Sequence, residues 1–267
     1  MIAAVAWLAV VVLGALAADL MPLSPRDADA CQPSCLNVPP GHRISEILGT
    51  DNYGRSILTR VVYGARVSVT AGLASVAIAL TLGMLVGVSA GYFRRRFDTV
   101  VGVGLDALLS FPPLILLLAL AATMGPGLRT VVIGLSLISF PSFARLARAT
   151  TLRYRSSEFV LASRGLGARA RTVLVREIVP VVIGPMLAYA GTVTGVLILT
   201  EASLSFLGLG VPPPQPSWGN MIFDGKSELS THPHVVFVPA AVLFLTIFAL
   251  HVVGEHFRGR NAKAGKL

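Results

Sequence analysis

The stretch Glu158–Pro180 reads EFVLASRGLGARARTVLVREIVP, a strongly charged run between two long apolar runs, and it must therefore lie in water. From Phe159 to Leu166, small and apolar residues recur at positions i, i+3, i+4 and i+7, which predicts a helix with one apolar face. Gly165 and Gly167 interrupt this pattern. Because glycine accepts the positive φ that ends a helix, the stretch predicts two short helices joined by a glycine bend, protruding between two membrane spans.

The composition around this stretch identifies an integral membrane protein. The 267 residues are 54% hydrophobic and 13% charged, with a mean hydropathy of +0.75, which exceeds the values of soluble domains. A net charge of +9 would suit a nucleic-acid-binding protein, but no basic patch is interleaved with aromatic residues. We therefore expect an all-α, polytopic membrane protein.

Six apolar runs predict six transmembrane helices, at 2–20, 67–92, 100–124, 131–146, 178–200 and 235–253. The first run could instead be a signal peptide cleaved after Ala17, but no basic segment precedes it. In the second run, glycines predict close helix packing. In the third, Pro112 and Pro113 remove amide donors and predict a bend.

The distribution of Lys and Arg predicts the orientation. With a cytoplasmic N-terminus, fifteen of the 22 basic residues lie in inner segments and seven in outer ones. Cytoplasmic loops of membrane proteins carry an excess of Lys and Arg. Both termini and the stretch Glu158–Pro180 are therefore expected in the cytoplasm.

Glu158–Pro180 resembles the cytoplasmic loop shared by the permease subunits of ATP-binding-cassette importers. The pattern of that family is Glu-Ala-Ala, three residues, Gly, and about a dozen residues to a Pro; in this chain a leucine stands at the position of the glutamate. In those importers the loop docks on the ATPase subunit. The resemblance thus assigns the ATPase contact to Leu161, Ala162, Ser163, Gly165, Gly167 and Pro180. The alternative is a basic loop that only satisfies the charge rule.

Three further segments, Leu48–Val69, Asp106–Pro112 and Ser203–Met221, closely resemble the C-type permease subunit of dipeptide, oligopeptide and nickel importers. The resemblance implies the type I permease fold and a transport subunit, not an enzyme, for peptides or for nickel or another small solute. It also implies a homologous second permease, two ATPase domains that bind ATP and Mg²⁺, an external substrate-binding protein, and a bacterial plasma membrane. No cofactor or metal is expected on this chain.

We expect three regions. Residues 1–66 hold the first span and an external loop whose apolar stripe from Ile57 to Val62 suits an interfacial helix. Residues 67–257 form a five-helix core with a coupling loop at about 149–177 and an external lid at about 203–234. The lid is rich in glycine and proline and cannot be one spanning helix. Residues 258–267 are a basic cytoplasmic tail.

Asp106 lies within the third predicted span, and Glu201 lies at the end of the fifth. A charge at the bilayer centre costs about 2.5–3.5 kcal/mol on insertion scales, so each carboxylate is expected to have a role that offsets this cost. Either both face a water-filled passage shared with a partner subunit, or Asp106 bonds to a neighbouring helix and Glu201 caps one. The sequence leaves these alternatives open.

Cys31 and Cys35 are the only cysteines and fall in the predicted outer loop, where an oxidising compartment favours a disulfide. A zinc site would need two more ligands, and only His42 is close.

The sequence contains no GxxxxGK[ST], the loop that binds nucleotide phosphates, so the chain lacks the means to bind and hydrolyse ATP by itself. It also contains no HExxH, the zinc motif of metalloproteases. The strongest alternative to an ATP-driven importer is an ion-coupled secondary transporter, because broken spans and intramembrane acids also suit ion coupling.

Overall fold

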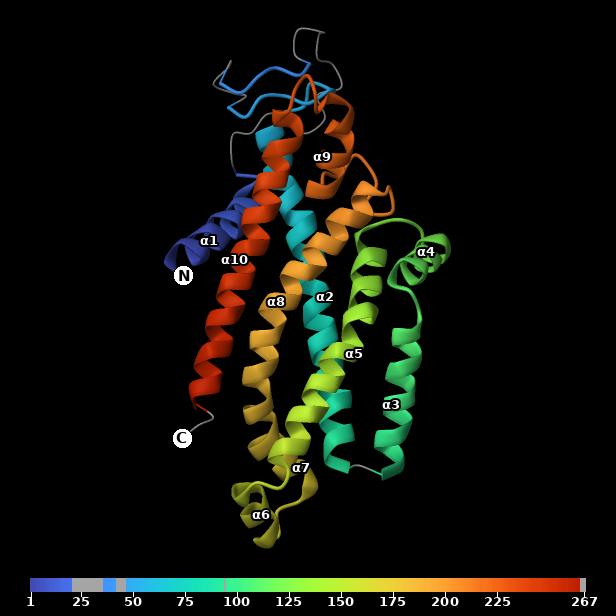
Figure 1. Cartoon of the computed structure of the whole chain (residues 1–267), viewed down its shortest axis with the longest axis vertical. Helices are drawn as coiled ribbons and strands as arrows, with labels where there is room; N and C mark the ends of the chain where they lie inside the picture. Colours follow the sequence, from blue (N-terminus) through green and yellow to red (C-terminus); the bar gives the residue numbers. More distant parts are fainter. Residues whose placement is uncertain (21–35, 42–46, 94, 265–267) are drawn as a thin grey trace.

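The computed structural model describes residues 1–20, 36–41, 47–93 and 95–264 (Figure 1). Within these ranges the chain is helical, and the only β pairing is a single bridge between Thr50 and Ser56. The expected all-α class is therefore confirmed. The helices are α1 (Ile2–Ala17), α2 (Ile57–Phe93), α3 (Arg95–Ser110), α4 (Pro113–Met124), α5 (Leu128–Tyr154), α6 (Glu158–Gly165), α7 (Ala170–Thr172), η3 (Val173–Ile178), α8 (Val179–Phe206), α9 (Trp218–Gly225), η4 (Lys226–Glu228) and α10 (His234–Ala264).

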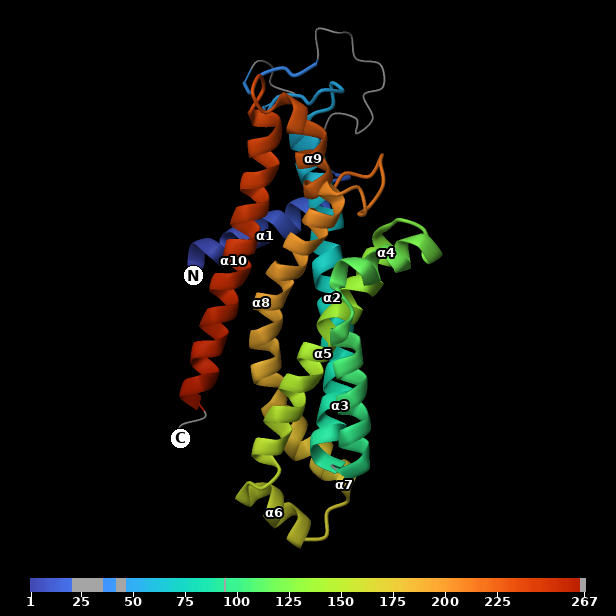
Figure 2. The same ribbon diagram turned by 45° about the vertical axis from the view of Figure 1, so that its right-hand side comes forward.

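Four helices in the described part are long and apolar enough to cross a membrane: Ile57–Phe93, Leu128–Tyr154, Ala170–Phe206 and His234–Phe257. The pair α3 and α4 makes a fifth if it counts as one broken span. Six spans are not confirmed, because α1 has only 16 residues and extends about 24 Å, less than a hydrocarbon core of about 30 Å. It lies across α10 and α2 at a steep angle, with Trp7 Nε1 donating to Thr246 Oγ1 at 3.1 Å (Figure 2).

The centre of the bundle is the packing of α2 against α5, to which α8 and α10 add further layers. Close approach of α2 and α5 requires glycine, as the glycine pattern predicted. A Cβ added at Gly87 would lie 2.8 Å from Ala147 Cβ, and one at Gly83 would lie 2.6 Å from Phe143 Cβ. Both contacts are too short for any side chain, so these two positions set the distance between the helices.

The predicted bend in the third span is confirmed. The axes of α3 and α4 meet at 85°, with Phe111 and Pro112 between them. Proline cannot donate the amide hydrogen bond that would continue α3, so the helix ends at Ser110 and a new one starts at Pro113.

Three expectations need correction or remain open. Residues 57–66 are the first turns of α2 and not a separate interfacial helix, because their apolar stripe packs on the bundle and the chain continues without a break to Phe93. The predicted tail from residue 258 stays a prediction; α10 continues to Ala264, beyond the apolar part that ends at Phe257. Cys31, Cys35 and His42 lie outside the described residues.

The bundle has two distinct ends (Figures 1 and 2). At one end α6 and α7 protrude beyond the long helices. At the opposite end lie α9 and the segment 47–56 that precedes α2. The loop and the lid of the sequence analysis thus sit at opposite ends of the molecule.

Candidate functional site

The protruding loop has the first predicted short helix, α6, and the predicted glycine bend. The second predicted short helix is not separate, because α7 continues through η3 into α8 and Ala170–Phe206 is one long helix. Gly167 has φ +82°, in the left-handed region. The Ala168 N–H donates to Ser163 O at 3.1 Å, and the Gly167 N–H donates to Arg164 O at 2.9 Å. These two bonds form a Schellman motif, in which Gly167 ends α6 and turns the chain toward α7.

One side of the protruding loop is buried against the bundle, and its other side is exposed. Val160 is fully buried and attaches α6 to the hydrophobic core, while Leu161 is 53% exposed and Leu166 is 89% exposed. Large apolar side chains at the tip of a protrusion are typical of a surface that a partner covers. The other residues assigned to the ATPase contact fall in two places: Ala162, Ser163, Gly165 and Gly167 are on the same loop with at least partial exposure, and Pro180 is exposed in the first turn of α8.

A pocket of about 340 Å³ opens where α5 ends and α6 begins. Its lining residues are Leu152, Arg155, Ser156, Leu161 and Arg164. The Arg164 guanidinium lies over the ring of Tyr92 on α2, 4.7 Å from the ring centre. Sequence reasoning missed this pocket, because Arg155 and Arg164 are nine positions apart on two helices and no periodicity relates them.

Asp106 lies on an exposed face of α3 and forms an ion pair with Arg145 of α5. Their side chains are 69% and 51% exposed, although both helices belong to the apolar bundle. Closer to the loop end, Asp98 pairs with Arg148, whose Nη2 lies 2.8 Å from Asp98 Oδ2. The two pairs run along one side of α3 and α5.

Glu201 is fully buried, and it does not lie on an open surface of the chain. Its carboxylate accepts hydrogen bonds from Ser68 Oγ at 2.8 Å and Ser205 Oγ at 2.7 Å. Ser68 Oγ in turn accepts the backbone N–H of Trp218 at 3.3 Å. This differs from the expectation of a passage residue, because α2, α8 and α9 pack around the carboxylate and leave it no access to water.

The segments Leu48–Val69 and Ser203–Met221 thus meet in space at the end opposite the loop. Besides the Glu201 network, the fully buried Trp218 donates its indole N–H to Val61 O at 3.0 Å. Trp218 also packs beside Gly64 of α2, where an added Cβ would lie 3.3 Å from the Trp218 ring. The two segments form one structural unit, although more than 130 residues separate them in the sequence.

Four charged side chains reinforce this unit. Asp51 Oδ2 lies 2.8 Å from Arg55 Nε and 3.5 Å from Arg60 Nη1. Asp224 at the end of α9 lies 3.2 Å from both Arg55 Nη2 and Arg60 Nη2. Arg60 is 5% exposed, so its charge depends on the two carboxylates for compensation. This charged cluster fixes α9 to the first turns of α2.

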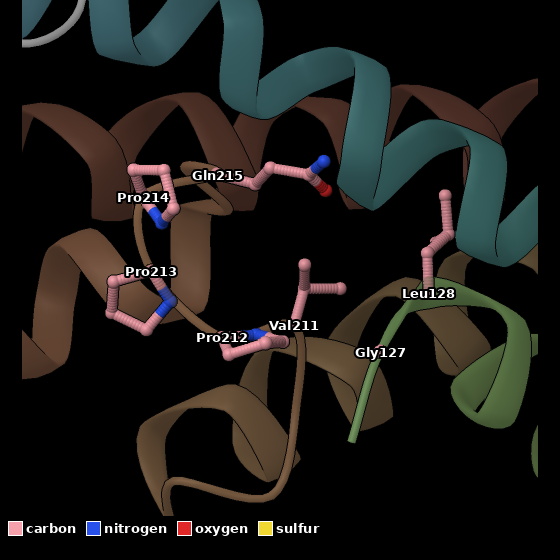
Figure 3. Close-up of a pocket in the computed structure, with 7 residues that line it drawn as sticks. All are labelled: Gly127, Leu128, Val211, Pro212, Pro213, Pro214 and Gln215. Atoms are coloured by element: carbon pink, nitrogen blue, oxygen red, sulfur yellow. The ribbon is translucent and has the colours of Figure 1, made fainter. Parts of the chain in front are cut away.

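A second pocket, of about 470 Å³, lies between the α4–α5 turn and the proline-rich loop that joins α8 to α9. Figure 3 shows Gly127 and Leu128 facing Val211 and Gln215 across it, with Pro212, Pro213 and Pro214 along the loop. Its walls are mostly apolar and rigid.

One hydrolase-like pattern is present and is excluded by its setting. Gly87–Gly91 reads GVSAG and matches GxSxG, the strand-to-helix turn that presents a nucleophilic serine. Here the pattern lies inside α2, and Ser89 Oγ donates to Leu85 O of the same helix at 2.6 Å. The residues are thus helix-packing glycines and a helical serine.

Comparisons with known proteins agree with this architecture. The chain is 37% identical over 211 residues to the glutathione transport system permease protein GsiD of Pectobacterium atrosepticum, covering 79% of this chain and 70% of that one. It is 36% identical over 220 residues to a putative peptide transport system permease protein of Brucella suis, covering 82% and 73%.

Among solved structures, the fold is similar to that of the MetNI methionine ABC transporter in inward-facing conformations. The TM-score is 0.60 at 19% identity, over 75% of this chain and 95% of that chain. Residues 67–262 match the family model described as binding-protein-dependent transport system inner membrane component. That range contains the bundle, the protruding loop and α9, and the chain therefore belongs to the family of binding-protein-dependent transport system inner membrane components.

Proposed function

We propose that this permease subunit imports peptides and forms half of a translocation pathway with a homologous second permease. Two ATPase domains would bind ATP and Mg²⁺ in the cytoplasm, and an external protein would deliver the substrate. The substrate class follows the relatives, which are named as a glutathione permease and a putative peptide permease. Peptides are thus favoured over nickel or another small solute.

The observation that carries the ATPase contact is the construction of the protruding loop. A Schellman bend at Gly167 holds α6 at a fixed angle, Val160 anchors it, and Leu161 and Leu166 are exposed. A rigid, apolar-tipped protrusion suits transmission of movement from an ATPase to the spans. In this proposal α6 docks on the ATPase, and ATP-driven closure opens the opposite end of the pathway.

The topology is also part of the proposal. We infer a multi-pass protein of a bacterial plasma membrane with six spans, α1 included, and with both termini and α6 in the cytoplasm. The excess of Lys and Arg on that side supports this orientation. In the outer loop, Cys31 and Cys35 form a disulfide under the same proposal.

Asp106 is the residue that we assign to the pathway. Exposing a charged group to lipid tails has a high free-energy cost. The exposed side of the Asp106–Arg145 ion pair therefore suits contact with water or with a partner subunit. Glu201, by contrast, is enclosed and is assigned a structural role.

Uptake in inside-out and right-side-out vesicles that hold the whole importer tests the proposal against an ion-coupled transporter. We expect dipeptide uptake that requires the binding protein and ATP on the ATPase side, and Asp106→Asn should retain most of it because no proton cycle is needed. Nickel uptake in parallel separates the substrate classes. Uptake driven by a proton gradient alone, without ATP, would contradict the assignment.

A further inference from the structure

The pocket between α5 and α6 has the character of an anion site that the chain itself leaves without an anion. Arg155 and Arg164 line it together with Leu152, Ser156 and Leu161. None of these five residues is acidic. Two arginines thus line one cavity of about 340 Å³, and no carboxylate is among its lining residues.

The guanidinium groups also have unused donors inside the structure. Arg155 Nη1 and Arg164 Nε are buried, and neither has a hydrogen-bond acceptor among the residues that the structure describes. A buried donor of a charged group is costly when it is unpaired, and such groups in folded proteins generally have a partner. These two N–H groups are also out of contact with solvent, so the two side chains bring positive charge beside the pocket that no carboxylate among its lining residues compensates.

The backbone of Arg155 and the guanidinium group of Arg164 are held in place before any partner arrives. Arg155 is the C-terminal cap of α5, and its backbone N–H donates to Thr151 O at 2.9 Å. Arg164 is in the last turn of α6, and its guanidinium stacks on Tyr92. A guanidinium in a fixed orientation binds a carboxylate with little further loss of side-chain freedom.

We propose that this pocket receives an aspartate or glutamate side chain of the ATPase subunit, bound between Arg155 and Arg164. This inference rests on the proposed function and names the chemistry of its contact. The surroundings favour a protein carboxylate over a lipid phosphate, because the pocket opens on a loop that protrudes beyond the long helices (Figures 1 and 2). Exposed Leu161 forms one wall of the pocket and gives the charged contact an apolar border, as in the energetic centres of protein interfaces.

The test measures the dissociation constant between the ATPase subunits of the importer and the pair of permeases in nanodiscs of zwitterionic lipid. We expect Arg155→Gln and Arg164→Gln each to weaken binding about tenfold or more, because each removes a charge-assisted hydrogen bond from a buried contact. Arg96→Gln is the matched control. It removes the same charge from an exposed position on α3, outside the protruding loop, and should change binding less than about threefold.

A second variant fills the pocket without removing an arginine. Leu161→Glu places a carboxylate three positions before Arg164 on α6, where it competes with the incoming side chain. We expect it to weaken ATPase binding about tenfold, compared with Leu161→Gln as the neutral control. Gel filtration of each variant shows that the permease pair is intact before binding is measured.

Three outcomes are decisive. Wild-type affinity of Arg155→Gln and Arg164→Gln, or equal affinity of Leu161→Glu and Leu161→Gln, would overturn the inference while leaving the proposed function in place. Variants that bind the ATPase normally but lose binding to phosphatidylglycerol vesicles would assign the pocket to lipid and also overturn it. Absence of ATPase binding by the wild-type permeases would instead contradict the proposed function.

Discussion

At the scale of single residues, the backbone conformation of Gly167 and the burial of Glu201 each predict the effect of a substitution. Gly167 has φ +82° with open space around it, so a side chain there meets no neighbour and only the backbone is strained. Glu201 has the opposite character, a buried carboxylate whose side chain is surrounded and hydrogen-bonded. Substitutions at these positions should therefore affect coupling and stability, respectively.

We expect Gly167→Val to separate ATP hydrolysis from uptake. The left-handed conformation costs about 1–2 kcal/mol for a residue with a Cβ and more for a β-branched one, so the bend between α6 and α7 changes while membrane insertion is unaffected. The measurement is peptide transported per ATP hydrolysed in vesicles. Gly41→Val is the control, because Gly41 has φ +81° and open surroundings but lies outside the loop. Normal coupling in Gly167→Val would show that the bend is not needed.

Glu201→Leu should destabilise the fold more than Glu201→Gln. Leucine leaves the Ser68 and Ser205 hydroxyls without their acceptor, at about 1–3 kcal/mol for each orphaned group, whereas glutamine can still accept one bond and donate another. Thermal unfolding of the purified protein measures the difference. Ser203→Ala on the exposed side of the same helix is the control and should be near neutral. Equal melting temperatures for Glu201→Leu and wild type would rule out the structural role.

At the scale of elements, α9 depends on contacts far away in the sequence. It has eight residues, and an isolated helix of this length is not stable in water. Its position comes from burial of Trp218 and from Asp224, which accepts from Arg55 and Arg60 of the α2 region. The stability of α9 in this position therefore depends on the charged cluster that attaches it to α2.

We expect Asp224→Asn to loosen α9. The substitution removes the negative charge that faces Arg55 and the buried Arg60. Removing one partner of a fully buried ion pair costs about 3–5 kcal/mol of stability. The cost is smaller here because Asp224 is partly exposed. Hydrogen exchange should become faster in residues 218–225. Asp19→Asn is the matched control, because Asp19 pairs with Arg66 with 60% of its side chain exposed, and such pairs contribute little. Unchanged exchange in α9 would show that Trp218 alone holds the lid.

At the scale of the whole molecule, the bundle separates a charged, protruding loop end from an end that carries the lid. Leu166 is 89% exposed at the first end and Leu229, which follows η4, is 47% exposed at the second. These two positions are accessible markers of sidedness, and they test the orientation inferred from the distribution of Lys and Arg.

Cysteines at these positions should react from opposite sides of the membrane. In a background with Cys31→Ser and Cys35→Ser, a membrane-impermeant maleimide added to intact spheroplasts should label Leu229→Cys and spare Leu166→Cys. Inverted vesicles should give the reverse pattern. The same side for both cysteines would contradict the topology, and exchanged sides would reverse it.

The sequence by itself determined the membrane class, the break at Phe111–Pro112 and the short helix α6 with its bend at Gly167, but not that the second helix of the loop continues into α8. Each follows from a local property: hydropathy over about 20 residues, a missing amide donor, or tolerance of positive φ. The sequence did not reveal that 57–66 continues into α2, because an apolar stripe suits an interface and a bundle equally well.

Only the tertiary structure decided what surrounds each polar side chain. It enclosed Glu201 among three helices, placed Arg60 between Asp51 and Asp224, and brought Arg155 and Arg164 to one pocket. Burial and pairing of charge depend on residues more than a hundred positions away as well as on near ones, and hydropathy or spacing along one segment carries no information about them. Local chain chemistry fixes where helices begin and bend, whereas packing fixes which of their polar groups are left open to a partner.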